Sequence, residues 1–106
     1  EVIYGLQSCP PSVDLSTRPA VSNPKLRKTV NQLYHPGASV GSGSTADAIR
    51  YEKATGLPVG GRWHAQKGKE RIKNLEGILR SENLDAWDRR VAEALLEDLK
   101  DALGLN

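Results

Sequence analysis

The sequence has no phenylalanine and no methionine, and only one cysteine and two histidines among its 106 residues. A single cysteine, Cys9, excludes an internal disulfide, and so few nitrogen and sulfur ligands do not make a structural zinc site. No apolar run approaches the roughly 20 residues that a membrane-spanning helix needs. With two tryptophans and three tyrosines as its aromatic residues, the chain must build an aliphatic core. These absences predict one small domain with no metal, no cofactor and no membrane span.

The first 23 residues show no helical period. Prolines in Cys9-Pro10-Pro11, Arg18-Pro19 and Asn23-Pro24 turn the backbone away from helix. We expect residues 1–23 to be a linker or an N-terminal arm, and residues 24–106 to be the folded domain. Because the chain begins with neither a methionine nor a signal-peptide pattern, we also expect it to be a piece of a longer protein.

Helix signals recur four times in the rest of the chain. Apolar spacing and capping residues predict helices over residues 24–34, 45–54, 65–81 and 86–103. The expected N-terminal caps of the first, second and fourth helices are Asn23, Ser44 and Asp85. The last two helices are joined by a short connection, so we expect them to pair antiparallel. The predicted fold class is mainly α, a small single-domain bundle of about four helices with an irregular N-terminal lead.

Charge is unevenly distributed along the chain. Residues 1–21 carry a net charge of −1, and residues 75–106 carry −4. Residues 22–74 hold ten basic and three acidic side chains, which gives +7. Such a block can steer a polyanion to one face of the molecule, or it can simply be a solvated helix surface.

Basic residues and glycines gather where the third helix begins, around His64. Gly60 and Gly61 leave the backbone free to approach a phosphate, and the amides at a helix start attract its negative charge. Trp63 has two interpretations, because it can stack on a base, as can Tyr34, or fill the core. The residues predicted to bind RNA are Arg62, Trp63, Lys69, Lys53, Gly60 and Gly61.

Several chemistries do not fit the sequence. The glycines around Lys69 lack the spacing of a P-loop, and no H-E-x-x-H motif occurs. The carboxylates of the basic region are too dispersed for a divalent-metal nuclease. What the residues permit is metal-independent cleavage of RNA, in which an imidazole takes the proton of a ribose 2′-hydroxyl and a second group protonates the leaving oxygen. His35 and His64 are the two imidazoles, although His35 can equally cap the end of the first helix.

A series of short motifs resembles the C-terminal toxin domains of bacterial polymorphic toxins, which include the contact-dependent growth inhibition (CdiA-type) effectors. The matching motifs are Tyr34-His35-Pro36-Gly37-Ala38-Ser39-Val40, Gly43-Ser44-Thr45-Ala46-Asp47-Ala48-Ile49-Arg50, Thr55-Gly56, Val59-Gly60-Gly61, His64 and Lys67-Gly68. The resemblance extends over about residues 33 to 103.

This resemblance implies a toxin exported as the C-terminal part of a large cell-surface protein and active in the cytoplasm of a target bacterium. It implies cleavage of RNA, foremost of tRNA near the acceptor end, and neutralisation by a cognate immunity protein. Some members of the class act with elongation factor Tu, which makes this factor a further expected partner. Carried onto the matching positions, the candidate catalytic set is His64, His35, Arg50, Lys67, Thr45 and Asp47.

Within this set, the hypothesis gives each residue a role. His64 is the general acid or base, and His35 is its counterpart if the two loops converge. Arg50 and Lys67 stabilise the phosphate, while Thr45 and Asp47 orient their neighbours. For Asp47, capping of the second helix is the competing interpretation.

Two further functions remain open on the sequence. A non-catalytic helical module would bind RNA or a translation factor through the basic region and retain binding without its histidines. An immunity protein is a third interpretation, but the +7 charge of residues 22–74 argues against it, because inhibitors of basic toxins are often acidic.

Overall fold

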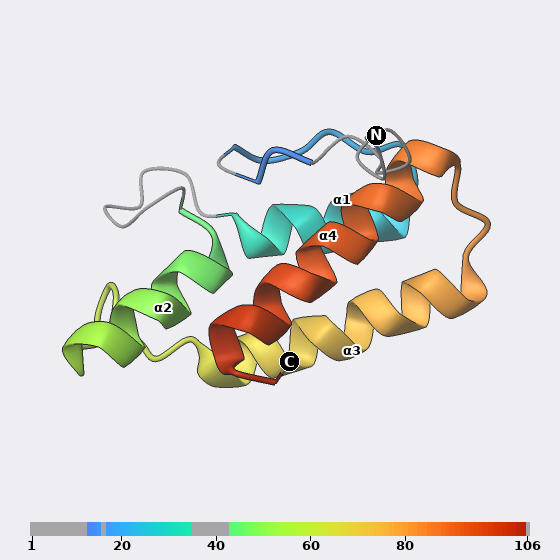
Figure 1. The fold of residues 1–106 in the computed structure, drawn as a ribbon. Coiled ribbons are helices and arrows are strands. Elements are labelled where there is room, and N and C mark those ends of the chain that lie inside the picture. The colour runs from blue at the N-terminus through green and yellow to red at the C-terminus, as the bar shows by residue number, and fades with distance from the viewer. Residues whose placement is uncertain (1–12, 16, 35–42, 106) are drawn as a thin grey trace, which may run out of the picture.

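The chain folds into four α-helices joined by loops (Figure 1). A computed structural model describes residues 13–15, 17–34 and 43–105. The helices are α1 (Pro24–Leu33), α2 (Thr45–Thr55), α3 (Ala65–Ser81) and α4 (Ala86–Leu103). Within the described residues there is no strand, and pairing is limited to two isolated bridges. The mainly α-helical fold is therefore confirmed, with each helix ending within one residue of its predicted bounds.

Local capping chemistry fixes most of the helix ends. The side chains of Asn23, Ser44 and Asp85 accept hydrogen bonds from first-turn amides of α1, α2 and α4. At their other ends, α2 and α4 stop at Gly56 and Gly104, which have φ values of 72° and 75°. Glycine adopts this left-handed conformation without a steric penalty. All three predicted caps are thus confirmed, and α3 is the helix that begins without one.

The core is aliphatic and draws buried side chains from all four helices. As predicted, α3 and α4 run in opposite directions and pack together, while α2 contacts both and α1 lies on α3 (Figure 1). The largest fully buried hydrophobic side chains are Leu26, Val30, Ile49, Leu75, Val91 and Leu99. Among the described helices, none combines the length and apolar character that crossing a membrane requires.

The described part of the N-terminal lead lies against the helices. The hydroxyl of Tyr34 donates to the carbonyl of Leu15 at 2.7 Å. The carboxylate of Asp88, which is 1% exposed, accepts the backbone amides of Ser22 and Asn23 at 2.8–3.1 Å. This stretch is therefore tied to the folded unit by both α1 and α4.

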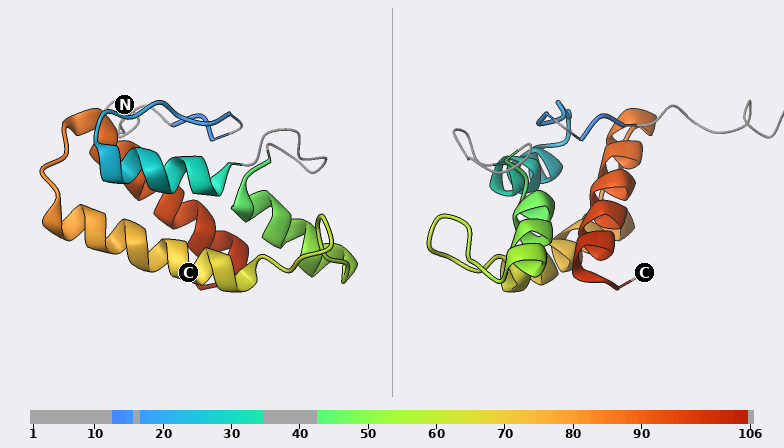
Figure 2. Two further views of the ribbon diagram at one scale, coloured as in Figure 1. Left: turned by 180° about the vertical axis from the view of Figure 1, so that it is seen from behind. Right: turned by 60° about the vertical axis from the view of Figure 1, so that its left-hand side comes forward.

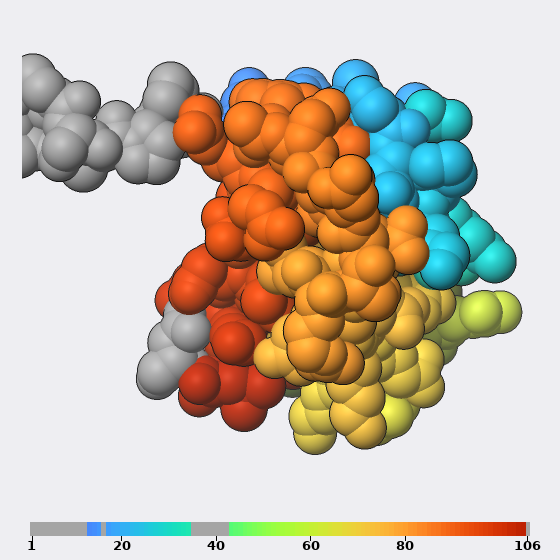
Figure 3. Space-filling model, turned by 90° about the vertical axis from the view of Figure 1, so that its right-hand side faces the viewer, coloured from blue at the N-terminus to red at the C-terminus, as the bar shows by residue number. Residues whose placement is uncertain are grey.

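The two inter-helix connections around α3 lie at opposite ends of the molecule (Figure 2). At one end, the α3–α4 connection packs beside the start of α1 (Figure 3). There, Glu82 accepts a hydrogen bond from the Asn23 side chain at 3.2 Å and pairs with Lys25 at 3.0 Å. The α2–α3 loop projects from the other end, where the polar residues of the candidate site gather.

Candidate active site at the junction of α2 and α3

A buried carboxylate joins α2 to the start of α3. Glu52 lies on α2 and is 6% exposed. Its Oε2 lies 2.6 Å from Nδ1 of His64, and its Oε1 accepts the backbone amide of His64 at 2.9 Å. Oε2 also accepts the amide of Val59 at 3.2 Å. One side chain therefore positions both the imidazole ring and the loop that leads to it.

These contacts decide the charge of Glu52. Burial opposes its ionisation, but hydrogen bonds from the backbone and ring of His64 and from the backbone of Val59 outweigh that effect and lower the pKa of Glu52. An ionised carboxylate accepts hydrogen bonds and cannot donate them. In its contact with Glu52, the Nδ1 of His64 is therefore the donor and carries a proton. In the neutral ring, Nε2 then has a free lone pair for proton transfer. The His64 side chain is 21% exposed, which leaves the ring within reach of a bound molecule.

The α2–α3 loop turns tightly just before His64. The amide of Arg62 donates to the carbonyl of Val59 at 3.1 Å, and the two residues between them, Gly60 and Gly61, have φ values of 61° and 75°. A two-residue turn with both central φ angles positive favours glycine strongly. The turn geometry alone therefore explains the glycine pair, and both residues are exposed with open space around them.

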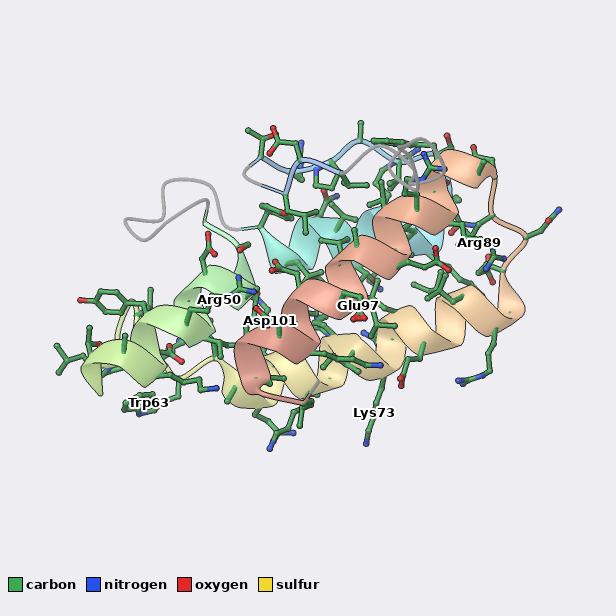
Figure 4. All side chains as sticks on the ribbon, viewed as in Figure 1. Arg50, Trp63, Lys73, Arg89, Glu97 and Asp101 are labelled. Atoms are coloured by element: carbon green, nitrogen blue, oxygen red, sulfur yellow. The ribbon has the colours of Figure 1, made fainter. Side chains whose placement is uncertain are left out.

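The predicted RNA-binding residues of this region lie on the surface. Trp63 is 61% exposed and projects from the loop (Figure 4), so its interpretation as core filler is wrong. Arg62 and Lys69 are also exposed, and Lys67 is half-buried one turn into α3. Tyr34 is buried, and the hydrogen bond of its hydroxyl to the lead occupies it, so it does not offer a stacking surface.

A second group of predicted residues lies between α2 and α4. The guanidinium of Arg50 contacts Asp98 at 2.6 Å, Asp101 at 2.9 Å and Asp47 at 3.3 Å, and Arg50 and Asp101 face one another in Figure 4. Burial opposes the charge of Arg50, but the hydrogen bonds and charges of Asp98 and Asp101 outweigh it and raise the pKa of Arg50. A phosphate at Arg50 would have to compete with these three carboxylates.

Three more predicted residues make contacts within the fold. The buried hydroxyl of Thr45 donates to the carbonyl of Leu33 at 3.2 Å, which links the end of α1 to the start of α2. The ammonium of Lys53 donates to the carbonyl of Ala102 at 3.1 Å, near the end of α4. Asp47 donates its backbone amide to the Ser44 cap, as the capping interpretation requires. His35 lies outside the described residues.

The candidate catalytic set thus divides into two groups. His64 and Lys67 lie together at the start of α3, whereas Thr45, Asp47 and Arg50 make contacts that hold α2 to its neighbours. Glu52 was missed from the sequence. Its signal is that it falls three residues after Ile49 on the buried stripe of α2, where a carboxylate needs a polar partner.

Comparison with protein-family models, curated proteins and solved structures finds no match to this chain. In the part of the chain that the structure describes, no three histidine, cysteine or acidic side chains gather closely enough to hold a metal ion. The Glu52–His64 junction is the feature of the described structure that bears most directly on function.

Proposed function

We propose that this chain is an RNA-cleaving bacterial toxin domain in which His64 transfers protons and Glu52 positions it. The observation that carries the proposal is the 2.6 Å contact between the buried Glu52 carboxylate and Nδ1 of His64. The same carboxylate also holds the backbone amide of His64, so both the ring and its attachment to the chain are fixed. A histidine whose ring is fixed, with the other nitrogen available, suits acid–base catalysis at neutral pH.

In this proposal, Nε2 of His64 takes the proton of a ribose 2′-hydroxyl. The 2′-oxygen then attacks the adjacent phosphorus, and the bond from phosphorus to the 5′-oxygen breaks. The products are a 2′,3′-cyclic phosphate and a 5′-hydroxyl, once a second group has protonated the leaving oxygen. The resemblance gives that second role to His35. Glu52 stabilises the imidazolium that forms, and Lys67 stabilises the negative charge on the phosphate.

The surroundings of His64 support a nucleic-acid substrate. Arg62 and Lys69, which flank His64 in the sequence, add exposed positive charge, and the 61% exposed Trp63 offers a face on which a base can stack. From the resemblance we take the biological setting. The domain is exported within a larger surface protein, cuts tRNA in the target cytoplasm with or without elongation factor Tu, and is held inactive by an immunity protein.

The test is an RNA-cleavage assay in EDTA with total bacterial RNA, with and without elongation factor Tu and GTP. The wild type is expected to shorten tRNA and leave a 2′,3′-cyclic phosphate. His64→Ala is expected to slow cleavage by about 10²–10⁴-fold, the usual contribution of a positioned acid or base. Asn74→Ala, which changes an exposed polar residue later on α3, is the matched control and should cleave normally.

Intact RNA in every lane, with a folded wild-type protein, would overturn the enzymatic proposal. The exposed Trp63 and its cationic neighbours then favour one alternative function, that of a module that binds RNA without cutting it. A gel-shift assay on the same samples decides between them. The binding module would retain RNA equally in the wild type and in His64→Ala.

A further inference from the structure

We infer that Lys67 and Arg71 form a phosphate-binding subsite on α3 that holds the RNA backbone beside His64. The inference takes its substrate class from the proposed function. It adds a residue, Arg71, that neither the sequence motifs nor the Glu52–His64 contact identifies.

The first observation is the spacing of Lys67 and Arg71 on α3 relative to His64, the residue just before the helix. His64, Lys67 and Arg71 are spaced three and four residues apart, which places them along one side of a helix. At 1.5 Å per residue, Lys67 lies about 5 Å and Arg71 about 10 Å from His64 along the helix axis. The two cations therefore extend the site from His64 in one direction, which is the arrangement that a chain of phosphates requires.

The second observation is that a polar atom of Arg71 has no partner. Its Nε is buried, and no atom of the described residues accepts its hydrogen. Burying a charged donor without an acceptor costs free energy, so folded proteins rarely keep one without a role. Arg50 shows the usual solution in this same chain, because three carboxylates surround its guanidinium.

The third observation is that Lys67 lies half-buried next to Arg71 with no acid to compensate. Burial, followed by the positive charge of Arg71, lowers the pKa of Lys67. Across the described ranges, no carboxylate lies within ion-pair distance of either cation. Two neighbouring cations that repel each other are relieved by an anion that binds both, and a phosphate diester oxygen pair matches the fork of an arginine.

Binding can be measured without cleavage by using a 2′-O-methyl oligonucleotide, which lacks the 2′-hydroxyl nucleophile. We expect Lys67→Gln and Arg71→Gln each to weaken binding by about tenfold, as loss of a charge-assisted phosphate contact does. The matched controls are Lys73→Gln and Arg80→Gln, which remove the same charges from exposed positions of α3; Lys73 points away from the bundle in Figure 4. The controls should change the dissociation constant by less than about twofold.

A direct readout needs no variant. The side-chain N–H signals of the Arg71 guanidinium in an NMR spectrum of the wild type should shift when inorganic phosphate is added, while those of exposed arginines such as Arg80 stay in place. Equal losses in all four glutamine variants, or an Arg71 signal that ignores phosphate, would overturn the subsite. Because neither measurement requires cleavage, a protein that binds the oligonucleotide through this pair but leaves RNA intact would refute the enzymatic proposal alone.

Discussion

The carboxylate of Glu52 on α2 and the Nδ1 of His64, the residue just before α3, lie 2.6 Å apart. The same carboxylate accepts the backbone amides of His64 and Val59. Burial removes water as a competitor for all three hydrogen bonds. The contact that orients the proposed catalytic ring is therefore also the contact that fixes the loop, and its loss should be visible in stability as well as in activity.

Glu52→Gln should change both stability and activity. An amide at this position can donate to Nδ1, which would move the ring proton of His64 to Nε2 and remove the free base. We expect a loss of about 1–3 kcal/mol in the free energy of unfolding, because charge-assisted bonds are replaced inside the fold. Chemical denaturation measures the loss in the free energy of unfolding, and nitrogen NMR of the imidazole reports the tautomer.

The matched control is Glu97→Gln, which makes the same change at an exposed position of α4 (Figure 4). It should leave stability, tautomer and cleavage as they are. If Glu52→Gln keeps the wild-type tautomer and still cleaves RNA at the wild-type rate, Glu52 is not the positioning residue.

The lowered pKa of Glu52 also predicts an acid-sensitive fold. Folding lowers this pKa below its usual value of 4.5, so the unfolded chain takes up the proton first as the pH falls. The stability that ionised Glu52 contributes is thus complete above about pH 5 and is lost as the pH falls through 4.5 toward the folded-state pKa.

The difference in the free energy of unfolding between the wild type and Glu52→Gln should therefore shrink as the pH falls from 7. Denaturation curves of both proteins at a series of pH values measure it. Glu82, whose pKa is lowered by hydrogen bonds from Asn23 and Lys25, contributes to both proteins and cancels in the difference. A stability difference that is constant between pH 7 and pH 3 would contradict the assignment of an ionised, hydrogen-bonded Glu52.

The helices could be predicted from the sequence because their signals are local. The Asn23 side chain needs only the two amides that follow Pro24, and Gly104 needs only the end of its own helix. Such interactions span a few residues, so spacing alone reveals them. The same holds for the aliphatic stripes of α3 and α4, whose period fixes the buried faces.

The candidate site could be predicted only in part, because its contacts join distant segments. A cluster along the chain identifies His64 and Lys67, but the partner of His64 lies twelve residues earlier, on α2. Arg50 forms ion pairs with Asp98 and Asp101, which are 48 and 51 residues away in the sequence, so the spacing of short motifs could not predict them. Of the two interpretations of Trp63, core filler is wrong, because aliphatic side chains fill the core and Trp63 is 61% exposed.

The contacts of Arg50 predict that its replacement affects folding more than RNA binding. Arg50→Gln removes the bridge from α2 to Asp98 and Asp101 on α4 and leaves two carboxylates close together. Because the Arg50 side chain is 37% exposed, solvent screening limits the expected loss to about 1–2 kcal/mol in the free energy of unfolding. Thermal or chemical denaturation measures it, with the exposed Arg89→Gln on α4 as the control.

Oligonucleotide binding by folded Arg50→Gln should match that of the wild type within about twofold, because its charge is already paired. A loss as large as that of Lys67→Gln would instead place a phosphate at Arg50, as the motif resemblance implied. The two variants remove one charge each, so net charge does not confound their comparison.

We expect alanine to have opposite effects on stability at the two glycines of α3, Gly68 and Gly77. Alanine in a helix interior is normally more stable than glycine by about 0.5–1 kcal/mol. At Gly77 an added Cβ meets nothing within 4 Å, so Gly77→Ala should stabilise the protein by about that amount. At Gly68 the Cβ would lie 2.7 Å from Cδ1 of Ile49, which belongs to the buried core.

Gly68→Ala must therefore push Ile49 or move α3 away from α2, and overpacking of this kind costs about 1–3 kcal/mol. We expect a net destabilisation of about 1 kcal/mol, read from the denaturation midpoint. The amide of Gly68 also makes the first backbone bond of α3, to the carbonyl of His64. A shift of α3 would thus reach the Glu52–His64 contact and lower RNA cleavage, whereas Gly77→Ala should not. If both variants are equally stabilised, α2 and α3 do not approach as closely as the Gly68–Ile49 contact requires.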